Sequence, residues 1–282
     1  MAIYFCYVRP GVLSCFLVKV LSANSCDGHV GSLYGQHSQK VIYVRLDRVH
    51  IRDGVNMKKD NQDALILFFI KYPEPGAVKT RLAESIGSEE AAQLYRNFIL
   101  DLLAKLKLAE LPFKICFYPE QKREILMGWL GHEYEYNQQS GADLGERIAA
   151  AFQGAFSGGH RRVILIGSDS PDLPQSFLEE SLGVLNTHDA VIGPAMDGGY
   201  YLIGFRNETF LPAAFEGIDW DTESVFRKTL SLLKDYKRRV YVLPVWNDID
   251  TIEDLRQLIS RSEDTGFATS KTMSFLSKLK LP

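Results

Sequence analysis

From Ala64 onward, short apolar runs alternate regularly with amphipathic segments, and this pattern limits the chain to few fold classes. Residues 64–70 form an unbroken apolar run, which is typical of a strand buried on both faces of a sheet. Residues 88–108 repeat apolar side chains every three or four positions, which predicts a long amphipathic helix. Strands that alternate with helices form a mostly parallel sheet with helices on both faces, so we predict an α/β fold. The same patterns predict strands at residues 64–70, 113–118, 134–136, 162–167, 189–193, 200–205 and 240–245, and helices at residues 88–108, 122–130, 144–156, 175–185, 222–233 and 251–260.

The first 60 residues differ from the rest of the chain. They show no sustained helical period and no clear alternation of strands with helices. We therefore expect residues 1–60 to be a disordered N-terminal extension, or a spurious one translated from upstream of the true start, since Met57 would make an ordinary N-terminus. The predicted α/β domain spans residues 61–262, and residues 263–282 are expected to form a loosely packed C-terminal tail.

Composition and charge argue against two classes of binding partner, nucleic acids and membranes. The net charge of −3 argues against a general nucleic-acid-binding protein, which needs clustered Lys and Arg. The best apolar stretch near the N-terminus, residues 11–18, is too short to span a bilayer. The four cysteines lack the short spacing of a zinc or redox motif, and Cys116 lies in an apolar run that predicts burial. We expect a cytoplasmic protein that neither binds nucleic acid nor inserts stably into a membrane, and the sequence does not indicate its oligomeric state.

The loop after the first predicted strand is rich in groups that suit a diphosphate. Lys79 supplies a point charge and Arg81 a planar fork of donors, and together they suit phosphate oxygens. Because ligands of open α/β folds bind at the carboxyl ends of the strands, we predict Lys79 and Arg81 as catalytic residues. The substrate-binding residues predicted in this loop are Lys71, Pro75, which stiffens it, and Gly76, which permits close backbone approach. The alternative is a solvated basic turn.

Carboxylates follow two further predicted strands. Asp169 comes directly after the clearest buried strand, and one or two such carboxylates can hold Mg²⁺ when substrate phosphates complete the ligand shell. Asp172 could be a second ligand, but its place before a predicted helix favours a role as helix cap. Asp248 or Asp250 could supply the second carboxylate, although Asp250 or Thr251 is also a natural helix cap. We predict Asp169 and Asp250 as the metal ligands, with Asp169 also catalytic.

Two more stretches are candidates for contact with a sugar or a phosphate. Asp197, Gly198 and Gly199 lie between two predicted strands and form either a hairpin turn or a loop that contacts the sugar. Arg147, near the start of a predicted helix, can reach a phosphate or form a local ion pair. Trp220 can stack on a sugar or fill the core, which is the commoner place for tryptophan. We predict all five as substrate-binding residues.

These stretches, in this order, resemble a family of bacterial transferases of the glycosyltransferase-A (GT-A) type, which are described as radical-SAM/selenodomain-associated or arsenosugar-biosynthesis glycosyltransferases. The resemblance covers about residues 63–260. It implies the fold of the nucleotide-diphospho-sugar transferase superfamily, a three-layer α/β/α sandwich with a mostly parallel mixed sheet, and it puts Asp169 where that fold has its metal-binding acid. The family pattern usually has Ser where this chain has Asp221, and residues 1–56 match nothing in it. The matching segments are residues 71–82 (KYPEPGAVKTRL), 141–147 (GADLGER), 167–174 (GSDSPDLP), 193–204 (GPAMDGGYYLIG), 220–222 (WDT) and 248–255 (DIDTIEDL).

The leading hypothesis is a metal-dependent glycosyltransferase that moves a sugar from a nucleoside-diphosphate sugar to an unknown acceptor. Asp169 and Asp250 would hold Mg²⁺ or Mn²⁺ on the diphosphate, while Lys79 and Arg81 neutralise charge on the leaving group. The partner is then a nucleotide or a nucleotide sugar. One alternative is a nucleotidylyltransferase of the guanylyltransferase kind on the same fold. Another is a catalytically inactive nucleotide-binding module.

Overall fold

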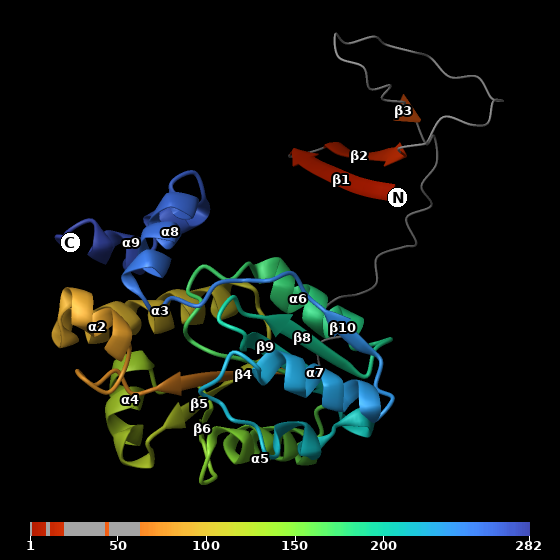
Figure 1. Cartoon of the computed structure of the whole chain (residues 1–282), viewed down its shortest axis with the longest axis horizontal. Helices are drawn as coiled ribbons and strands as arrows, with labels where there is room; N and C mark the ends of the chain where they lie inside the picture. Colours follow the sequence, from red (N-terminus) through yellow and green to blue (C-terminus); the bar gives the residue numbers. More distant parts are fainter. Residues whose placement is uncertain (1, 10–11, 20–42, 45–62) are drawn as a thin grey trace. The chain divides into compact units, whose positions relative to one another are not determined.

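The computed structural model describes residues 2–9, 12–19, 43–44 and 63–282 of the chain (Figure 1). The chain divides into two units, Met1–Val55 and Asn56–Pro282. In the first unit, three short strands that the sequence analysis did not predict form an antiparallel sheet. The rest of the predicted extension, residues 1–60, lies outside the described residues, and the predicted domain boundaries stay predictions. The three strands are β1 (Ala2–Arg9), β2 (Val12–Lys19) and β3 (Tyr43–Val44).

The second unit is built on a seven-stranded mixed sheet, which confirms the predicted fold class (Figure 1). The strand order is β10-β8-β9-β7-β4-β5-β6. Only β9 runs antiparallel to its neighbours, and every other pairing in this sheet is parallel. The strands are β4 (Ala64–Lys71), β5 (Phe113–Tyr118), β6 (Tyr136–Gln138), β7 (Arg162–Ile166), β8 (Ala190–Pro194), β9 (Tyr200–Arg206) and β10 (Val240–Val242).

The central strand β4 shows why the predicted apolar run had to lie in the middle of the sheet. Its side chains alternate between the two faces, because successive residues of a strand point to opposite sides. Ile66 and Phe68 belong to one hydrophobic cluster, and Leu65 and Leu67 belong to a second cluster on the opposite face. The first cluster receives side chains from helices α3 (Ser88–Leu108), α4 (Arg123–Leu130), α6 (Gln175–Val184) and α8 (Ile252–Ser262). The second receives them from α5 (Leu144–Ser157) and α7 (Val225–Asp235). The result is the predicted three-layer sandwich.

The helices follow the predicted segments closely, with two additions, α2 and α9. Helix α2 begins directly after Lys79 and was expected to be loop. Helix α5 is capped by Asp143, whose carboxylate accepts a hydrogen bond from the amide of Glu146 at 2.8 Å. No helix in the described part of the chain is long and apolar enough to cross a membrane. The helices are α2 (Thr80–Ile86), α3 (Ser88–Leu108), α4 (Arg123–Leu130), α5 (Leu144–Ser157), α6 (Gln175–Val184), α7 (Val225–Asp235), α8 (Ile252–Ser262) and α9 (Lys271–Leu276).

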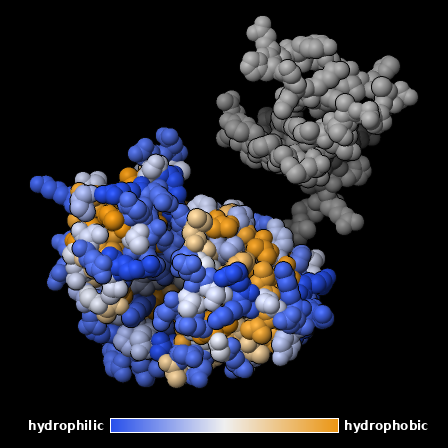
Figure 2. All heavy atoms as spheres, in the orientation of Figure 1, coloured by the Kyte–Doolittle hydropathy of each residue, from blue (hydrophilic) through white to orange (hydrophobic). Residues whose placement is uncertain are grey.

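The outer strand β10 leaves apolar side chains in solvent. Val242 is 44% exposed and Val245, just beyond the strand, is 51% exposed. Figure 2 shows hydrophobic residues gathered over this part of the molecule, in the region of β10 and α7. The strand is three residues long, and so short an edge offers few backbone groups for unwanted pairing with another chain.

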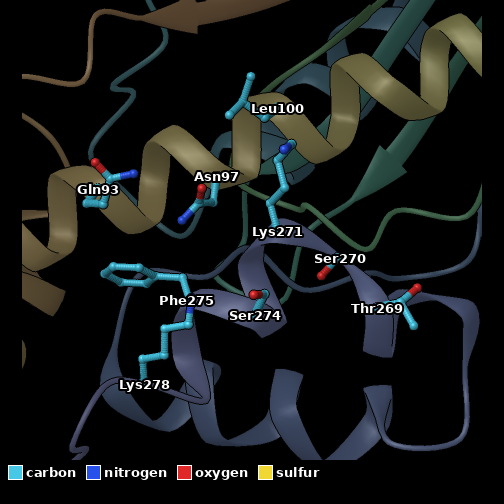
Figure 3. A pocket seen from close by; sticks show the side chains of 9 residues that line it. All are labelled: Gln93, Asn97, Leu100, Thr269, Ser270, Lys271, Ser274, Phe275 and Lys278. Atoms are coloured by element: carbon cyan, nitrogen blue, oxygen red, sulfur yellow. The ribbon is translucent and has the colours of Figure 1, made fainter.

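The C-terminal segment packs on α3, so the prediction of a loosely packed tail is wrong. Leu276 belongs to the hydrophobic core, and Thr272 is fully buried. The carboxylate of Asp101, in the middle of α3, accepts hydrogen bonds from the amides of Lys271 and Thr272 at 2.9 and 2.8 Å. Figure 3 shows side chains of α3 and of the C-terminal segment lining a groove between them. The weak periodicity of these residues hid a short helix that is fixed by tertiary contacts.

We predict that Asp101→Ala loosens α9. The substitution leaves two amide groups at the start of α9 without their acceptor, and the loss of such a capping contact typically costs about 1 kcal/mol. Hydrogen exchange of residues 271–276 should accelerate accordingly, while exchange in β4 stays unchanged. Asp101→Asn keeps one acceptor oxygen and should show a smaller effect. Equal exchange in the alanine variant and the unmodified protein would contradict the prediction.

Candidate active site

A cavity of about 390 Å³ lies at the carboxyl ends of the parallel strands, where ligands bind in open α/β folds. We call it the strand-end cavity. Its lining includes residues that follow or end four neighbouring strands: Ile70 of β4, Tyr118 of β5, Gln139 after β6 and Asp169 after β7. Arg147 and Leu144 of α5 lie on its wall.

A second cavity of about 740 Å³ adjoins the first. Asp197, Gly199, Trp220 and Asp248 line both, so the two form one continuous site. We call the second one the acidic cavity because carboxylates dominate its lining. It is lined by Arg81, Met196, Asp197, Gly199, Trp220, Asp221, Thr222, Glu223, Asp248, Asp250, Thr251 and Asp254.

The structure brings the four predicted catalytic and metal-binding residues together. The ammonium group of Lys79 forms ion pairs with Asp169 and with Asp250, the latter at 2.8 Å. Arg81 donates to the other carboxylate oxygen of Asp250 at 2.8 Å. The loops after β4, β7 and β10 therefore meet at one point, as predicted from the positions of these residues after strands.

Lys79 combines a buried side chain with a left-handed backbone. Its side chain is only 3% exposed, and its backbone is left-handed, with φ of 49°, immediately before α2. Burial alone would lower the pKa of Lys79, but the nearby carboxylates of Asp169 and Asp250 outweigh burial and raise it above the ordinary value. The side chain therefore stays charged. A strained backbone that the surroundings enforce is common at functional sites.

Asp248 is the acid that the sequence analysis placed second to Asp250. Its carboxylate accepts a hydrogen bond from the hydroxyl of Ser170 at 2.5 Å. Burial and, next, the carboxylate of Asp169 raise the pKa of Asp248 to about 7. The intervening Ile249 is fully buried, and its amide donates to the backbone carbonyl of Asp169 at 2.9 Å. This contact holds the two loops side by side.

Two buried residues that the sequence analysis did not single out brace the strand ends. The hydroxyl of Tyr95 on α3 bonds the hydroxyl of Ser168 at 2.6 Å and accepts from the amide of Lys71 at 3.1 Å. Burial raises the pKa of Tyr95 to about 12, so the phenol stays neutral. The Gln139 amide donates to the carbonyls of Ile70 and Cys116 at 3.1 and 2.8 Å, which joins the ends of β4 and β5. Both had looked like ordinary residues of a helix face and a polar loop.

The predicted role of Asp172 as a helix cap is wrong. Helix α6 begins after Pro174 and has no side-chain cap. The carboxylate of Asp172 instead accepts from Arg261 of α8 at 2.7 and 3.1 Å, and from the indole of Trp246 at 3.3 Å. Asp172 thus fixes the loop that carries Asp169 against α8.

The predicted substrate-binding residues of the first loop lie in different places. Lys71 lines the strand-end cavity, and its ammonium donates to the carbonyl of Ala77 at 2.7 Å. Pro75 and Gly76 are exposed and are not among the residues that line the two cavities. Gly76 has a φ of 76° with open space around it, so a turn accounts for glycine here. Their contact with a substrate stays a prediction.

The guanidinium group of Arg147 lies over the ring of Tyr118, with its central carbon 4.1 Å from the ring centroid. Its guanidinium donates to the backbone carbonyl of Gly141 at 3.1 Å, and the neighbouring Glu146 accepts from the amide of Ala142 instead. The local ion pair considered from the sequence is therefore not formed. Stacking and this hydrogen bond fix Arg147 on the wall of the strand-end cavity.

The hairpin turn considered for the loop between β8 and β9 is confirmed. The Asp197 carboxylate accepts from the amide of Gly199 at 2.9 Å, which stabilises the turn. Gly198 has a φ of 89°, and a Cβ atom there would lie 2.2 Å from the backbone oxygen of Glu223. Trp220 is partly buried, packs edge-on against Tyr200 and lines both cavities. Its indole nitrogen has no hydrogen-bond partner within the described part of the chain.

The carboxylates at the junction of the two cavities can hold a divalent cation if substrate phosphates supply the remaining ligands. Among the described residues, no three or more His, Cys, Asp or Glu side chains are grouped as a metal site. Asp169 and Asp248 nevertheless lie close enough for one carboxylate to raise the pKa of the other. Mg²⁺ and similar ions take oxygen ligands and commonly use substrate phosphates to complete their shell. Two carboxylates are therefore a sufficient protein contribution.

A mixed sheet with this strand order, with an acid after β7 and cations after β4 at one cleft, defines a protein of the nucleotide-diphospho-sugar transferase class. Comparison with solved structures agrees: a crystal structure of a candidate nucleotide-diphospho-sugar transferase from Desulfovibrio desulfuricans G20 is 44% identical, with a TM-score of 0.75 over 77% of this chain and 94% of that one. The chain belongs to the same family as that protein. The family model that matches it, over residues 102–222, is DUF2064, described as uncharacterized proteins conserved in bacteria.

More distant relatives carry a different name. A 2-phospho-L-lactate guanylyltransferase from Methanocaldococcus jannaschii is 26% identical over 67% of this chain and 80% of its own length. The guanylyltransferase of the same name from Methanocaldococcus infernus is 26% identical over 64% of this chain and 78% of its own. The superfamily implied by the resemblance is thus supported. The finer name, a radical-SAM/selenodomain-associated or arsenosugar-biosynthesis glycosyltransferase, stays a prediction.

We predict that Asp248 makes the stability of the metal-free protein depend on pH. Its pKa of about 7 in the folded chain lies above its ordinary value of 3.8, so the folded state holds a proton that the unfolded state releases. The stabilising contribution is complete below the unfolded pKa and is lost as the pH rises through 7. Between pH 5 and 8 the loss should be about 2 kcal/mol.

Urea unfolding in the presence of a chelator measures this dependence. Asp248→Asn carries no titrating carboxyl and should flatten the decline between pH 5 and 8. Asp219→Asn, which removes an exposed carboxylate outside both cavities, is the matched control and should keep the decline. A decline of the same size in the Asp248 variant would show that another group is responsible.

Proposed function

We propose that the protein transfers a sugar from a nucleoside-diphosphate sugar to an acceptor in a metal-dependent reaction. One arrangement supports this proposal: the buried ammonium group of Lys79 pairs with Asp169, which lines the strand-end cavity, and Asp248 nearby lines both cavities. A cation and two carboxylates at the carboxyl ends of the strands suit a diphosphate with a divalent ion. The cavities on either side give room for the nucleotide and for the groups between which the sugar moves.

Asp248 suits the metal better than Asp250, the residue predicted from the sequence. Both carboxylate oxygens of Asp250 already accept from cations, one from Lys79 and one from Arg81. One oxygen of Asp248 accepts from Ser170, and its charge is countered only by groups farther away. We therefore infer that Asp169 and Asp248 hold Mg²⁺ or Mn²⁺, while Asp250 positions Lys79 and Arg81. The bound ion would offset negative charge on the leaving diphosphate.

The cationic side chains of the first loop support the departure of the diphosphate. Lys79 is charged, buried and fixed between two loops, so little reorganisation is needed when negative charge develops beside it. Arg81 lies at the edge of the acidic cavity with its side chain 61% exposed, from where its fork can move onto a phosphate. The loss of one such group costs on the order of 10²–10³ in rate in comparable sites.

The strand-end cavity suits the nucleoside part of the donor. Its wall combines apolar side chains such as Leu144 with the stacked pair of Arg147 and Tyr118. Both amide hydrogens of Gln139 go to backbone carbonyls, so its carbonyl oxygen is the atom left to accept a hydrogen bond from a base. Polar atoms fixed in an apolar pocket are typical of cofactor and nucleotide sites.

Asp169→Asn should abolish metal-dependent nucleotide binding in a folded protein. The amide is isosteric but carries no charge for the cation, so the gain in affinity for UDP or GDP on adding Mn²⁺ should fall by at least about tenfold. Isothermal titration calorimetry with and without Mn²⁺ measures the gain. Asp219→Asn serves as the control and should bind like the unmodified protein. An unchanged Mn²⁺-dependent gain in Asp169→Asn would remove this residue from the site.

A guanylyltransferase reaction is the second candidate, because the matched relatives from Methanocaldococcus carry that name over about four fifths of their length. The two reactions differ in what leaves. A nucleotidylyltransferase releases pyrophosphate from a nucleoside triphosphate, whereas a glycosyltransferase releases a nucleoside diphosphate from a sugar nucleotide. We expect release of nucleoside diphosphate from one member of a sugar-nucleotide panel, and no pyrophosphate from GTP in the presence of 2-phospholactate. Pyrophosphate release under these conditions would favour the second candidate.

A further inference from the structure

The negative charge of the acidic cavity limits which ligands can enter it. One cationic side chain, Arg81, lies in its lining, and Arg81 is already paired with Asp250. Six carboxylates share the lining with it, and they belong to Asp197, Asp221, Glu223, Asp248, Asp250 and Asp254.

These carboxylates are not equally neutralised. Asp254 closes the capping box of α8, where it accepts from the amide and hydroxyl of Thr251, each at 2.8 Å. Asp197, Asp221 and Glu223 are exposed to the cavity and form no ion pair with any described residue. They come from the β8–β9 hairpin and from the segment before α7. Three acids are thus free to meet a ligand.

The acidic cavity is also where the second substrate must approach. Asp248 lines both cavities, so an ion held by Asp169 and Asp248 would lie at their junction. With the nucleoside in the strand-end cavity, the sugar and its acceptor are left with the acidic cavity. Trp220 forms part of its wall, and an indole ring offers an apolar face to a sugar.

We propose that the acceptor is a sugar or amino sugar without phosphate or carboxylate groups. Carboxylates accept hydrogen bonds from hydroxyl groups and pair with ammonium groups, whereas they repel an acid brought into the same cavity. The inference rests on the proposed glycosyl transfer and names the acceptor class for it. It also separates this site from one that receives a phosphorylated acid.

Nuclear magnetic resonance of the complex with Mn²⁺ and UDP or GDP tests the acceptor class directly. Three probes of similar size are added at equal millimolar concentration: glucose, glucosamine and 3-phosphoglycerate. A probe that enters the acidic cavity comes near Mn²⁺, which accelerates the relaxation of its protons. We expect glucose and glucosamine to show at least threefold more acceleration than 3-phosphoglycerate. Equal acceleration of all three, or more for 3-phosphoglycerate, would overturn the proposal.

A charge-reversed variant sharpens the test. Asp221→Lys combined with Glu223→Lys should bring 3-phosphoglycerate close to Mn²⁺ and weaken the effect on glucosamine. Both residues are exposed, so the substitutions need no repacking of the core. The control is Glu216→Lys combined with Asp235→Lys, which makes the same change in net charge at exposed sites outside the cavity and should behave like the unmodified protein. Equal responses in the two double variants would mean that net charge, and not the cavity, governs entry.

Quenching of Trp220 fluorescence examines the cavity without nucleotide or metal, so it separates failure of this inference from failure of the proposed function. Trp129→Phe with Trp246→Phe leaves Trp220 as the sole tryptophan. Caesium should quench it at least threefold more efficiently than iodide, and Asp221→Lys with Glu223→Lys should reverse that order. Efficient quenching by iodide in the unreversed cavity would overturn the inference. If the unmodified protein shows no Mn²⁺-dependent nucleotide binding, glycosyl transfer fails whatever the quenching shows.

Discussion

The buried ammonium group of Lys79 is the contact on which the candidate site depends. It joins the loop after β4 to acids 90 and 171 residues away, Asp169 and Asp250, by an ion pair with each. Burying an amine is unfavourable unless opposite charges surround it, and here the carboxylates outweigh the cost of burial. Removing the amine would leave Asp169 without an ion-pair partner and Asp250 with Arg81 alone. The backbone of Lys79 is left-handed, and α2 begins at the next residue.

The ion pairs of Lys79 also determine which carboxylates at the site are left without a cationic partner. Asp248 and Asp250 lie on either side of Ile249, whose buried side chain and hydrogen bond to Asp169 anchor the loop. The two carboxylates consequently face different surroundings. Asp250 meets Lys79 and Arg81, while Asp248 turns to Ser170 and the junction of the cavities. Spacing along the chain alone cannot distinguish the two, since either could have faced the cations.

Sequence patterns were sufficient where a single periodicity decided the structure. The continuous apolar run of β4 and the helical repeat of α3 gave boundaries within one residue of those observed, because burial on two faces or on one stripe leaves little choice. The strand-end rule brought Lys79 and Asp169 together correctly. The two wrong predictions, a cap role for Asp172 and a loosely packed tail, concern residues whose partners lie far away along the chain. Asp172 pairs with Arg261, 89 residues later, and α9 depends on Asp101. Local capping preferences could not anticipate either contact.

A fold of this class does not by itself choose between moving a sugar and moving a nucleotide, since unrelated functions share common folds. The acidic cavity, which adjoins the proposed metal ligands Asp169 and Asp248, bears on that choice. Its free acids stand on two segments that Gly198 holds in contact, because the amide of Phe226 donates to the carbonyl of Gly198 at 2.9 Å and no side chain fits between Gly198 and Glu223. The glycine therefore sets where Asp197 and Glu223 stand relative to each other. In this cavity, a residue without a side chain determines how the charged side chains are placed.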